Sequence, residues 1–434
     1  MTHAFPVTAA SAGLGLPLTL SLLILAGLAA ACAVYWAVVL GMVVATRLRL
    51  PTARDGLALP EATVDAATPE AVCVVVPAHN EEGMIGALAR SLRAQDYPNL
   101  RFVFALDRCT DGTEAALRQA AGDDPRFEVV LITDCPPDWA GKVHAVHEAV
   151  TRAPGTRGAA YLLFADADTR FDPGCVRACL ALLKNRQLGL VSLLSTLSRR
   201  RWFEHVVQPA AGMELMRQYP PLRVNRRERE RARPFANGQF MLFRRDVYDA
   251  VGGHAAARAY LLEDIHLAGN VFYHGRAAVG LFLADGMLHC SMYESWPAFR
   301  RGWRRIYTEA GSRMPARLEK SAARLLFSGI ALPLAAVTAG ASGWAVWSAT
   351  GDPLGLVCLT LAPAALAAMT AGLVAVYRLG RSGLRGVPFY PLAAALVAGI
   401  LLEAARDLRR GKATKWGGRE YVRTRSNAPP TPPP

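Results

Sequence analysis

Two aspartates one residue apart are the side chains in this sequence best suited to bind a metal ion. Asp166 and Asp168 directly follow the short apolar run Tyr161-Leu-Leu-Phe-Ala165. Such a run is typical of a strand buried on both faces of a sheet, so the two carboxylates would lie on the loop after it. Mg²⁺ and Mn²⁺ prefer oxygen ligands and often share them with substrate phosphates. The pair therefore predicts a site for Mg²⁺ or Mn²⁺.

Two further polar clusters follow apolar runs in the same way. Pro77-Ala-His-Asn-Glu-Glu82 follows one run, and Asp107-Arg-Cys-Thr-Asp-Gly112 follows the next. Asn, Asp and Thr often cap helices, so any one cluster could be structural. In open α/β sheets, however, ligands bind outside the carboxyl ends of strands, and three such clusters together favour one shared site. Lys142, at the start of an expected helix, could bring a cation and helix amides to a phosphate.

Apolar runs and helical spacing predict the elements that position these clusters. Short apolar runs predict strands over residues 71–76, 101–106, 127–132 and 161–165. Apolar residues at helical spacing predict helices over residues 82–95, 110–120 and 142–151. The alternation of strand and helix predicts an α/β fold, a mostly parallel sheet with helices on both faces.

Composition and long apolar runs indicate a membrane protein. Of the 434 residues, 52% are hydrophobic and 19% are charged, which is below the roughly 25% charged residues of typical soluble domains. Residues 18–44 carry no charge and exceed the about 20 residues needed to cross a bilayer. Residues 325–351 and 353–377 predict a helical hairpin with Asp352 at its tip. A fourth apolar run, residues 386–402, is shorter and contains two prolines.

Basic residues beside the apolar runs predict the orientation of the chain. Arg47 and Arg49 follow the first run, and basic residues flank both ends of the hairpin, which places the section between them in the cytoplasm. A complete fourth span would carry the basic tail outside, so we expect the fourth run to be re-entrant or interfacial. The chain would lie in the inner (cytoplasmic) membrane as four units: an anchor (residues 1–48), a cytoplasmic α/β domain (49–320), the hairpin with the re-entrant or interfacial segment (321–404) and a basic tail with a Pro-rich end (405–434).

The motifs, taken in chain order, resemble those of the family 2 inverting glycosyltransferases, which have a GT-A fold. The resemblance rests on residues 74–82 (VVVPAHNEE), Asp107-Arg-Cys-Thr-Asp-Gly-Thr113, Gly141-Lys142, Asp166-Ala-Asp168 and Glu263-Asp264. The membrane-anchored type that glycosylates lipids is the most similar, namely ceramide glucosyltransferases and hopanoid-associated and carotenoid glycosyltransferases. The likeness covers about residues 71–310 by motif and the rest by membrane layout.

The resemblance implies a role for each matching residue. The donor-binding residues would be Pro77, Asn80, Glu82, Asp107, Lys142 and Asp166. Asp168 would bind the metal, and Asp264 would be the general base with Glu263 beside it. The acceptor or the diphosphate would lie near Gln239, Arg301, Trp303 and Arg304. The arginines and the single tryptophan of residues 300–305 stand in a different order from the family motif, which argues against a processive polysaccharide synthase.

The sequence thus predicts a membrane-bound inverting glycosyltransferase that moves a sugar from a nucleotide sugar, with UDP as the expected nucleotide, to a lipid acceptor. A polyprenyl-phosphate sugar transferase could use the same donor site and is the first alternative. A non-catalytic membrane scaffold that keeps the fold is an alternative of another class. The net charge of +14 does not indicate nucleic-acid binding, because the chain contains no nucleic-acid module.

Overall fold

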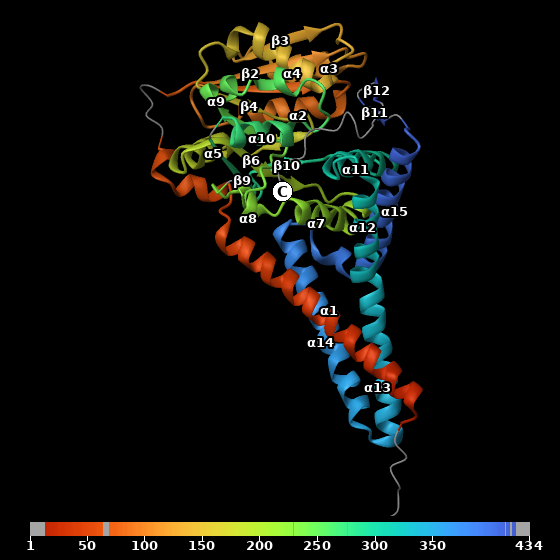
Figure 1. Ribbon diagram of the computed structural model, residues 1–434. Coiled ribbons are helices and arrows are strands. Elements are labelled where there is room, and N and C mark those ends of the chain that lie inside the picture. The colour runs from red at the N-terminus through yellow and green to blue at the C-terminus, as the bar shows by residue number, and fades with distance from the viewer. Residues whose placement is uncertain are drawn as a thin grey trace, which may run out of the picture.

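The computed structural model describes residues 14–63, 69–228, 230–275, 277–412, 414–416 and 419–421. An α/β head carries the polar clusters, and long helices leave it on one side as a narrow stalk (Figure 1). The expected Pro-rich end, residues 422–434, lies outside the described residues.

A seven-stranded sheet forms the centre of the head. Its strands lie in the order β3-β2-β1-β4-β8-β6-β9. They are β1 (Val72–Ala78), β2 (Leu100–Asp107), β3 (Phe127–Ile132), β4 (Tyr161–Phe164), β6 (Leu188–Leu194), β8 (Met241–Arg244) and β9 (Ala278–Leu283). All neighbouring strands pair in parallel except β8, which runs antiparallel to both β4 and β6. The first four strands confirm the predicted ranges to within two residues at each end.

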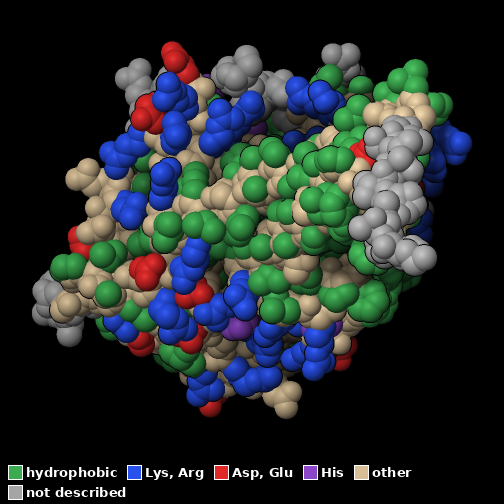
Figure 2. All heavy atoms as spheres, turned by 90° about the horizontal axis from the view of Figure 1, so that it is seen from below, with side chains coloured by type: hydrophobic (Ala, Val, Ile, Leu, Met, Phe, Trp, Pro, Cys, Tyr) green, Lys and Arg blue, Asp and Glu red, His purple; other side chains and the backbone are tan. Residues whose placement is uncertain are grey.

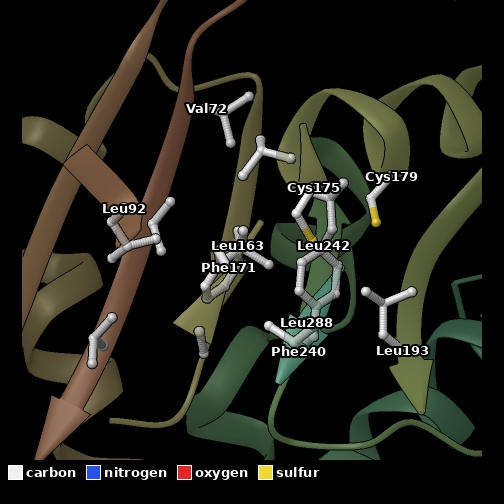
Figure 3. Close-up of a cluster of buried hydrophobic side chains, with 14 of the residues drawn as sticks. Val72, Leu92, Leu163, Phe171, Cys175, Cys179, Leu193, Phe240, Leu242 and Leu288 are labelled. Carbon is white, nitrogen blue, oxygen red and sulfur yellow. The ribbon is translucent and has the colours of Figure 1, made fainter. Parts of the chain in front are cut away.

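Helices cover both faces of the sheet, as the alternation of strand and helix predicted. Val72, Val74 and Val76 of β1 pack with α2 (Glu82–Arg93) and α5 (Cys175–Asn185) on one face. Cys73 and Val75 pack with α4 (Gly141–Arg152) and α10 (Glu263–Tyr273) on the other. Figure 3 shows the first cluster, in which side chains from α2, α5 and several strands point toward one another. The helices of the head are α2 (Glu82–Arg93), α3 (Thr113–Ala121), α4 (Gly141–Arg152), α5 (Cys175–Asn185), α6 (Trp202–Val206), α7 (Gln208–Gln218), α8 (Pro221–Val224), α9 (Arg245–Ala250), α10 (Glu263–Tyr273) and α11 (Trp296–Ala310).

Shorter elements join these parts. A three-stranded sheet of β5 (Thr169–Phe171), β10 (Leu288–Cys290) and β7 (Thr196–Leu197) begins directly after Asp168, and β11 (Thr414–Trp416) pairs with β12 (Arg419–Tyr421). The 3₁₀ turns are η1 (Arg54–Ala58), η2 (Pro60–Ala62), η3 (Pro154–Thr156), η4 (Gly253–Ala257) and η6 (Leu384–Phe389).

Among the residues that the structure describes, four helical segments are long and apolar enough to cross a membrane: Leu16–Arg49, Pro315–Thr350, Pro353–Leu379 and Leu384–Arg409. The second segment runs from α12 (Pro315–Leu326) through a π-helical turn, η5 (Phe327–Ala331), into α13 (Leu332–Thr350). With α1 (Leu16–Arg49) and α14 (Pro353–Leu379), α13 forms the stalk in Figure 1. Asp352 lies at the predicted tip, where its carboxylate accepts a hydrogen bond from the Leu354 N–H at 2.8 Å and caps α14.

The fourth apolar run forms α15 (Tyr390–Arg409), which lies beside α11 and α12 near the head rather than along the lower stalk (Figure 1). At its start, the Tyr390 ring packs edge-on against Trp36 of α1. At its end, Asp407 pairs with Arg304 of α11 at 3.1 Å, and Arg409 pairs with Glu319 of α12 at 2.7 Å. The run is long enough to cross a bilayer by length and composition, so its re-entrant or interfacial placement stays a prediction.

Candidate active site

A cavity of about 840 Å³ opens at the carboxyl ends of β1, β2 and β4 and extends to the stalk helices. Charged side chains line the end next to the sheet: Glu81, Asp107, Lys142, Asp166, Asp168, Glu263 and Asp264. Apolar side chains from α1, α7, α12 and α14 line the other end, among them Val39, Met42, Met213, Leu325 and Val376. One space therefore joins a polar cluster to the helices expected in the membrane.

Lys142 lies at the centre of the polar cluster, in the first turn of α4. Its Nζ is 2.8 Å from Asp166 Oδ1 and 2.7 Å from Glu263 Oε1. Burial alone would lower the pKa of this lysine, but the two carboxylates hold it above its ordinary value. Burial also opposes ionisation of Glu263, and the adjacent Lys142 nevertheless keeps the pKa of that carboxyl below its ordinary value. Lys142 and Glu263 are therefore both charged, and they join α4 to α10.

Asp168 is held between β4 and β5, where its carbonyl oxygen accepts a hydrogen bond from the Ser291 N–H at 3.1 Å. Burial and the charge of Asp166 raise the pKa of Asp168 to about 7. Burial and the charges of Asp168 and Asp166 also raise the pKa of Glu81 to about 7. Asp168 Oδ1 is shielded from solvent and has no hydrogen-bond partner among the described residues. This excess of negative charge and the unpaired carboxylate oxygen fit a divalent cation.

The protein would supply only part of a metal's coordination shell. Within the described ranges, no three His, Cys, Asp or Glu side chains are grouped so that they could hold a metal ion by themselves. Mg²⁺ is commonly bound by one or two carboxylates together with substrate phosphates and water. Asp168 and Asp166 match the protein's share of such a site.

Asp264 lies in the first turn of α10, half-buried at the cavity wall. Its carboxylate accepts hydrogen bonds from the Gly238 and Ile265 N–H groups, both at 2.8 Å. Burial and the charge of Glu263 raise the pKa of Asp264 to about 7, although Lys142 opposes the rise. A Cβ atom on Gly238 would lie 3.0 Å from Lys142 Nζ and 3.3 Å from Asp264 Oδ2, so the close approach favours glycine there. A carboxylate with a pKa near neutrality is suited to general-base chemistry.

Two of the predicted donor-binding residues, Asn80 and Glu82, do not line the cavity, and their donor-binding role stays a prediction. Asn80 is exposed, has a left-handed backbone (φ 57°), and its Oδ1 accepts a hydrogen bond from the Thr110 N–H at 2.8 Å. The Glu82 carboxylate accepts a hydrogen bond from the Gly112 N–H at 3.2 Å. Both side chains tie the loop after β1 to the loop after β2. Pro77 and Asp107 do line the cavity, and Arg108 donates two hydrogen bonds of 2.7 Å to the Asp107 carboxylate.

Helix α11 supplies a different arginine from those predicted. Arg301 is exposed, Arg304 turns toward Asp407 of α15, and neither lines the cavity. Trp303 and Arg305 do line it. Arg300 and Arg304 lie one turn apart and pair with Glu403 and Asp407, also one turn apart on α15. The face of α11 that carries Arg300 and Arg304 therefore packs against α15 and does not face the cavity.

The comparison with known families decides the identity of the head. A family model described as "Glycosyltransferase like family 2" matches residues 69–305, which is more than half of the chain. The chain belongs to this family. The match confirms the resemblance drawn from the motifs, and the mostly parallel α/β sheet is the one expected for its GT-A fold.

Individual relatives of this glycosyltransferase are distant. A 4,4'-diaponeurosporenoate glycosyltransferase of Staphylococcus aureus (strain MRSA252) is 27% identical over 259 residues, which are 57% of this chain and 63% of the relative. The chain therefore aligns with less than two thirds of that relative's length. A mannosyltransferase of Pyrobaculum calidifontis, solved with GDP-Man and Mn²⁺, is 21% identical over 86% of this chain and 97% of its own (TM-score 0.43). S. aureus TarS 1–349 with UDP-GlcNAc is 12% identical over 83% and 98% (TM-score 0.38).

Among the cavity residues that sequence reasoning did not assign to the site are Glu81, Gly238 and Arg305. Glu81 lies between Asn80 and Glu82, so the motif pointed to the right loop but not to the residue that faces inward. Arg305 ends the arginine run of residues 300–305, and only the register of α11 distinguishes it from Arg304. Gln239 lines the cavity, and its Oε1 accepts a hydrogen bond from Asn237 Nδ2 at 3.1 Å; its place near the acceptor or the diphosphate stays a prediction.

Proposed function

We propose that this protein transfers a sugar, with inversion, from a nucleotide sugar to an acceptor lipid that enters from the membrane. The observation that carries the proposal is that one continuous cavity is polar beside the sheet and apolar beside the stalk. The polar end suits a diphosphate and a sugar, and the apolar end suits a long hydrocarbon. The relative named for diaponeurosporenoate, a carboxylate, supports a lipid-like acceptor, and UDP is the donor nucleotide we propose.

Direct displacement at the anomeric carbon fits the side chains present. The acceptor oxygen would form its bond to that carbon as the bond to the leaving diphosphate breaks. Asp264 would take the acceptor's proton, because its pKa of about 7 leaves it basic enough to do so at neutral pH. The Lys142 cation, fixed between Asp166 and Glu263, would attract the phosphate groups of the donor. Glu263 would keep that lysine in place, which assigns it a positioning role.

Asp168 and Asp166 are the residues that would hold Mg²⁺ or Mn²⁺. Glu81 lies close enough that their charges raise its pKa. When bound, such an ion would neutralise negative charge that develops on the leaving diphosphate.

We further propose that the head lies in the cytoplasm and the stalk crosses the inner membrane. Figure 2 looks along the stalk toward the head, and Lys and Arg side chains gather around its hydrophobic surface. Basic residues next to a membrane span favour the cytoplasmic side. In this arrangement residues 1–48 and 321–404 hold the catalytic unit, residues 49–320, at the bilayer surface.

The test is to incubate the full chain in lipid nanodiscs with labelled UDP- and GDP-hexoses and a lipid extract, and to analyse products by mass spectrometry. We expect a glycosylated lipid that requires a divalent cation. A polyprenyl phosphosugar as the sole product would favour the polyprenyl-phosphate transferase instead. If no donor yields either a lipid product or hydrolysis, the protein is better explained as a non-catalytic membrane scaffold.

A cavity-filling variant tests the lipid route separately. Gly212 of α7 lines the cavity, and a Cβ atom there meets no other atom within 4 Å. Gly212→Phe should therefore fold normally, keep donor hydrolysis and lose at least about tenfold in transfer to lipid. Gly41→Phe is the control, because Gly41 is exposed on α1 and its Cβ position is equally open. Equal transfer by both variants would remove the apolar end from the acceptor path.

A further inference from the structure

A second charged cluster lies in the cavity wall, on the helices that join head and stalk. Glu214 of α7 is buried (3% exposed) and contacts two arginines. Its carboxylate accepts hydrogen bonds from Arg324 Nη2 of α12 at 2.7 and 3.0 Å, and from Arg217 Nη2 at 3.1 Å. All three residues line the cavity. Two cations share one carboxylate, so the cluster carries one uncompensated positive charge.

No other charge in this part of the described cavity wall cancels it. Arg381 and Asp285 also line the cavity, but they pair with each other at 2.6 Å and are neutral together. Arg324 uses Nη2 for Glu214 and for Ser321 Oγ, at 3.1 Å. Its Nε and Nη1 make no hydrogen bond within the part of the chain that the structure describes. Arg324 therefore keeps N–H donors for a ligand.

Ser328 adds a buried hydroxyl to the same wall. It lies four residues after Arg324, in the π-helical turn η5, and lines the cavity. Its side chain is 2% exposed, and Oγ has no hydrogen-bond partner among the described residues. A serine in an apolar helix usually donates to the carbonyl of an earlier turn, and a buried hydroxyl without a partner costs free energy. The hydroxyl is available to a molecule in the cavity.

Apolar side chains surround these polar groups. Leu325 of α12, Met42 of α1 and Val376 of α14 line the same cavity. α7 and α12 lie where the head meets the stalk, which is the level at which lipid head groups would be found (Figure 1). A cation with free donors, a free hydroxyl and an apolar wall together fit an amphiphile with an oxyanion at its head.

We propose that Arg324 and Ser328, supported by Arg217, form a subsite that anchors the carboxylate or phosphate of an acidic acceptor lipid, while a separate hydroxyl of that lipid, whose proton Asp264 would take, receives the sugar. This inference rests on the proposed function and adds to it the chemical class of the acceptor. A purely structural role, in which Glu214 joins α7 to α12, would explain one ion pair. It would explain neither the excess positive charge nor the unpaired hydroxyl of Ser328.

The test measures ligand binding without any sugar donor. The full chain in phosphatidylcholine nanodiscs is titrated with parinaric acid, a fluorescent long-chain carboxylic acid, and with its uncharged methyl ester. We expect the acid to bind at least about tenfold more tightly than the ester, as hydrogen bonds to a charged group imply. Ser328→Ala should weaken binding of the acid about tenfold and leave the ester and the melting temperature unchanged. Arg324→Gln should remove the preference for the acid.

Two matched variants control for the substitutions themselves. Arg317→Gln removes an exposed arginine of α12 that contacts Ser312. Ser348→Ala removes a serine of α13 that hydrogen-bonds its own helix. Neither residue lines the cavity, so both variants should keep the preference for the acid.

Equal affinity for acid and ester in the unaltered chain, or equal loss of both in Ser328→Ala, would overturn the subsite. Competition by dodecyl phosphate that depends on Ser328 would support it and extend it to phosphates. Displacement of the acid by phosphatidylglycerol, with the same dependence on Arg324, would assign the site to a bilayer lipid and overturn the acceptor assignment. The binding assay needs no sugar donor, so it tests the subsite separately from catalysis. If the unaltered chain prefers the acid but transfers no sugar to lipid, only the proposed function is contradicted. If it transfers sugar but binds acid and ester equally, only the subsite is contradicted.

Discussion

Two adjacent carboxyl groups have opposite pKa shifts, and this difference assigns their roles. Lys142 contacts Glu263 directly at 2.7 Å and holds its pKa below the ordinary value. Asp264 makes its hydrogen bonds to backbone N–H groups, and its neighbour's charge raises its pKa to about 7. Neighbouring groups whose environments separate their pKa values commonly have different tasks. Glu263 is thereby a partner for the lysine, and Asp264 is the candidate base.

Asp264→Asn should lower sugar transfer by about 10²–10⁴-fold, because an amide cannot accept the proton. Nucleotide binding, measured by calorimetry, should stay within about twofold.

The folded chain retains a proton on Asp264 up to about pH 7, whereas a carboxyl in the unfolded chain releases it near pH 4. Ionisation of Asp264 therefore costs stability as pH rises between these values, and the variant should melt no lower than the unaltered chain at pH 8. Asp246→Asn on the exposed surface of α9 is the control; near-normal transfer by Asp264→Asn would shift the base assignment to Glu263.

The same raised pKa predicts how transfer depends on pH. The base must be ionised, so kcat/KM should fall about tenfold per pH unit below roughly pH 7. Above that pH it should level off until another group titrates. A profile that stays flat down to pH 5, recorded with saturating metal, would contradict the assignment of Asp264.

Asp168→Asn tests the metal assignment. The change converts the carboxylate, one oxygen of which has no partner among the described residues, into an uncharged amide beside Asp166. We expect metal affinity and donor turnover each to fall by about 10- to 100-fold. Circular dichroism and the melting temperature should show an intact fold. An unchanged Mn²⁺ titration with unchanged turnover would exclude Asp168 as a ligand.

At the scale of elements, the register of α11 determines which arginine meets the substrate. Arg304 faces α15 and pairs with Asp407, whereas Arg305 lines the cavity. We expect Arg305→Gln to reduce transfer by about tenfold or more, since a half-buried cation that lines the cavity can make charge-assisted hydrogen bonds to the donor's phosphates, whereas Arg304 is turned toward α15. Arg304→Gln should change stability by less than about 1 kcal/mol and transfer by less than about twofold. The reverse ranking, measured as kcat/KM, would mean that α11 has a different register in the working enzyme.

The loop after β1 contains a residue with a left-handed backbone, Asn80. Asn80 has φ 57°, a conformation that Asn and Gly adopt more readily than Ala. Asn80→Gly should lose the hydrogen bond to Thr110 but keep the backbone geometry, whereas Asn80→Ala loses both. We therefore expect Asn80→Ala to be less stable than Asn80→Gly by about 1 kcal/mol in urea unfolding. Equal stability together with a large loss of nucleotide affinity in both variants would contradict this structural role and support Asn80 as a donor-binding residue.

For the whole molecule, the two ends of α15 contact different parts of the structure: its start packs against the stalk helix α1, and its last turn pairs with α11 of the head and with α12. Trp36 packs against Tyr390 at the start, and Arg304 and Glu319 pair with the last turn. This arrangement is consistent with a re-entrant or interfacial segment, although the helix is long enough to cross.

Cysteine accessibility in intact cells tests the orientation. Of the eight cysteines, all but Cys109 are buried. A Cys109→Ser chain should therefore react little with the maleimide and serve as the parent of the variants. An impermeant maleimide should label an Asp352→Cys variant from outside, because Asp352 lies at the tip of the stalk. Ser382→Cys and Lys412→Cys should be labelled only after the cells are permeabilised. Labelling of Lys412→Cys in intact cells would show that α15 crosses the membrane.

Local patterns in the sequence are enough to predict the elements that form the sheet and the stalk. Continuous apolar runs predict β1 to β4, since strands covered on both faces must be apolar throughout. The same reasoning applies to the stalk helices, whose length follows from bilayer thickness. The order of the motifs led to the family, and Asp166, Asp168, Lys142 and the pair Glu263-Asp264 do line one cavity.

Tertiary structure alone decided which side chains face that cavity. Loop geometry turns Glu81 inward and Asn80 and Glu82 toward a neighbouring loop, and packing against α15 turns Arg304 away from the site. The Arg324 and Ser328 subsite depends on α7 and α12, which are about a hundred residues apart in the sequence. Sequence spacing fixes which residues share a face of one element. The partner of that face is fixed by long-range packing, which one element's pattern does not encode.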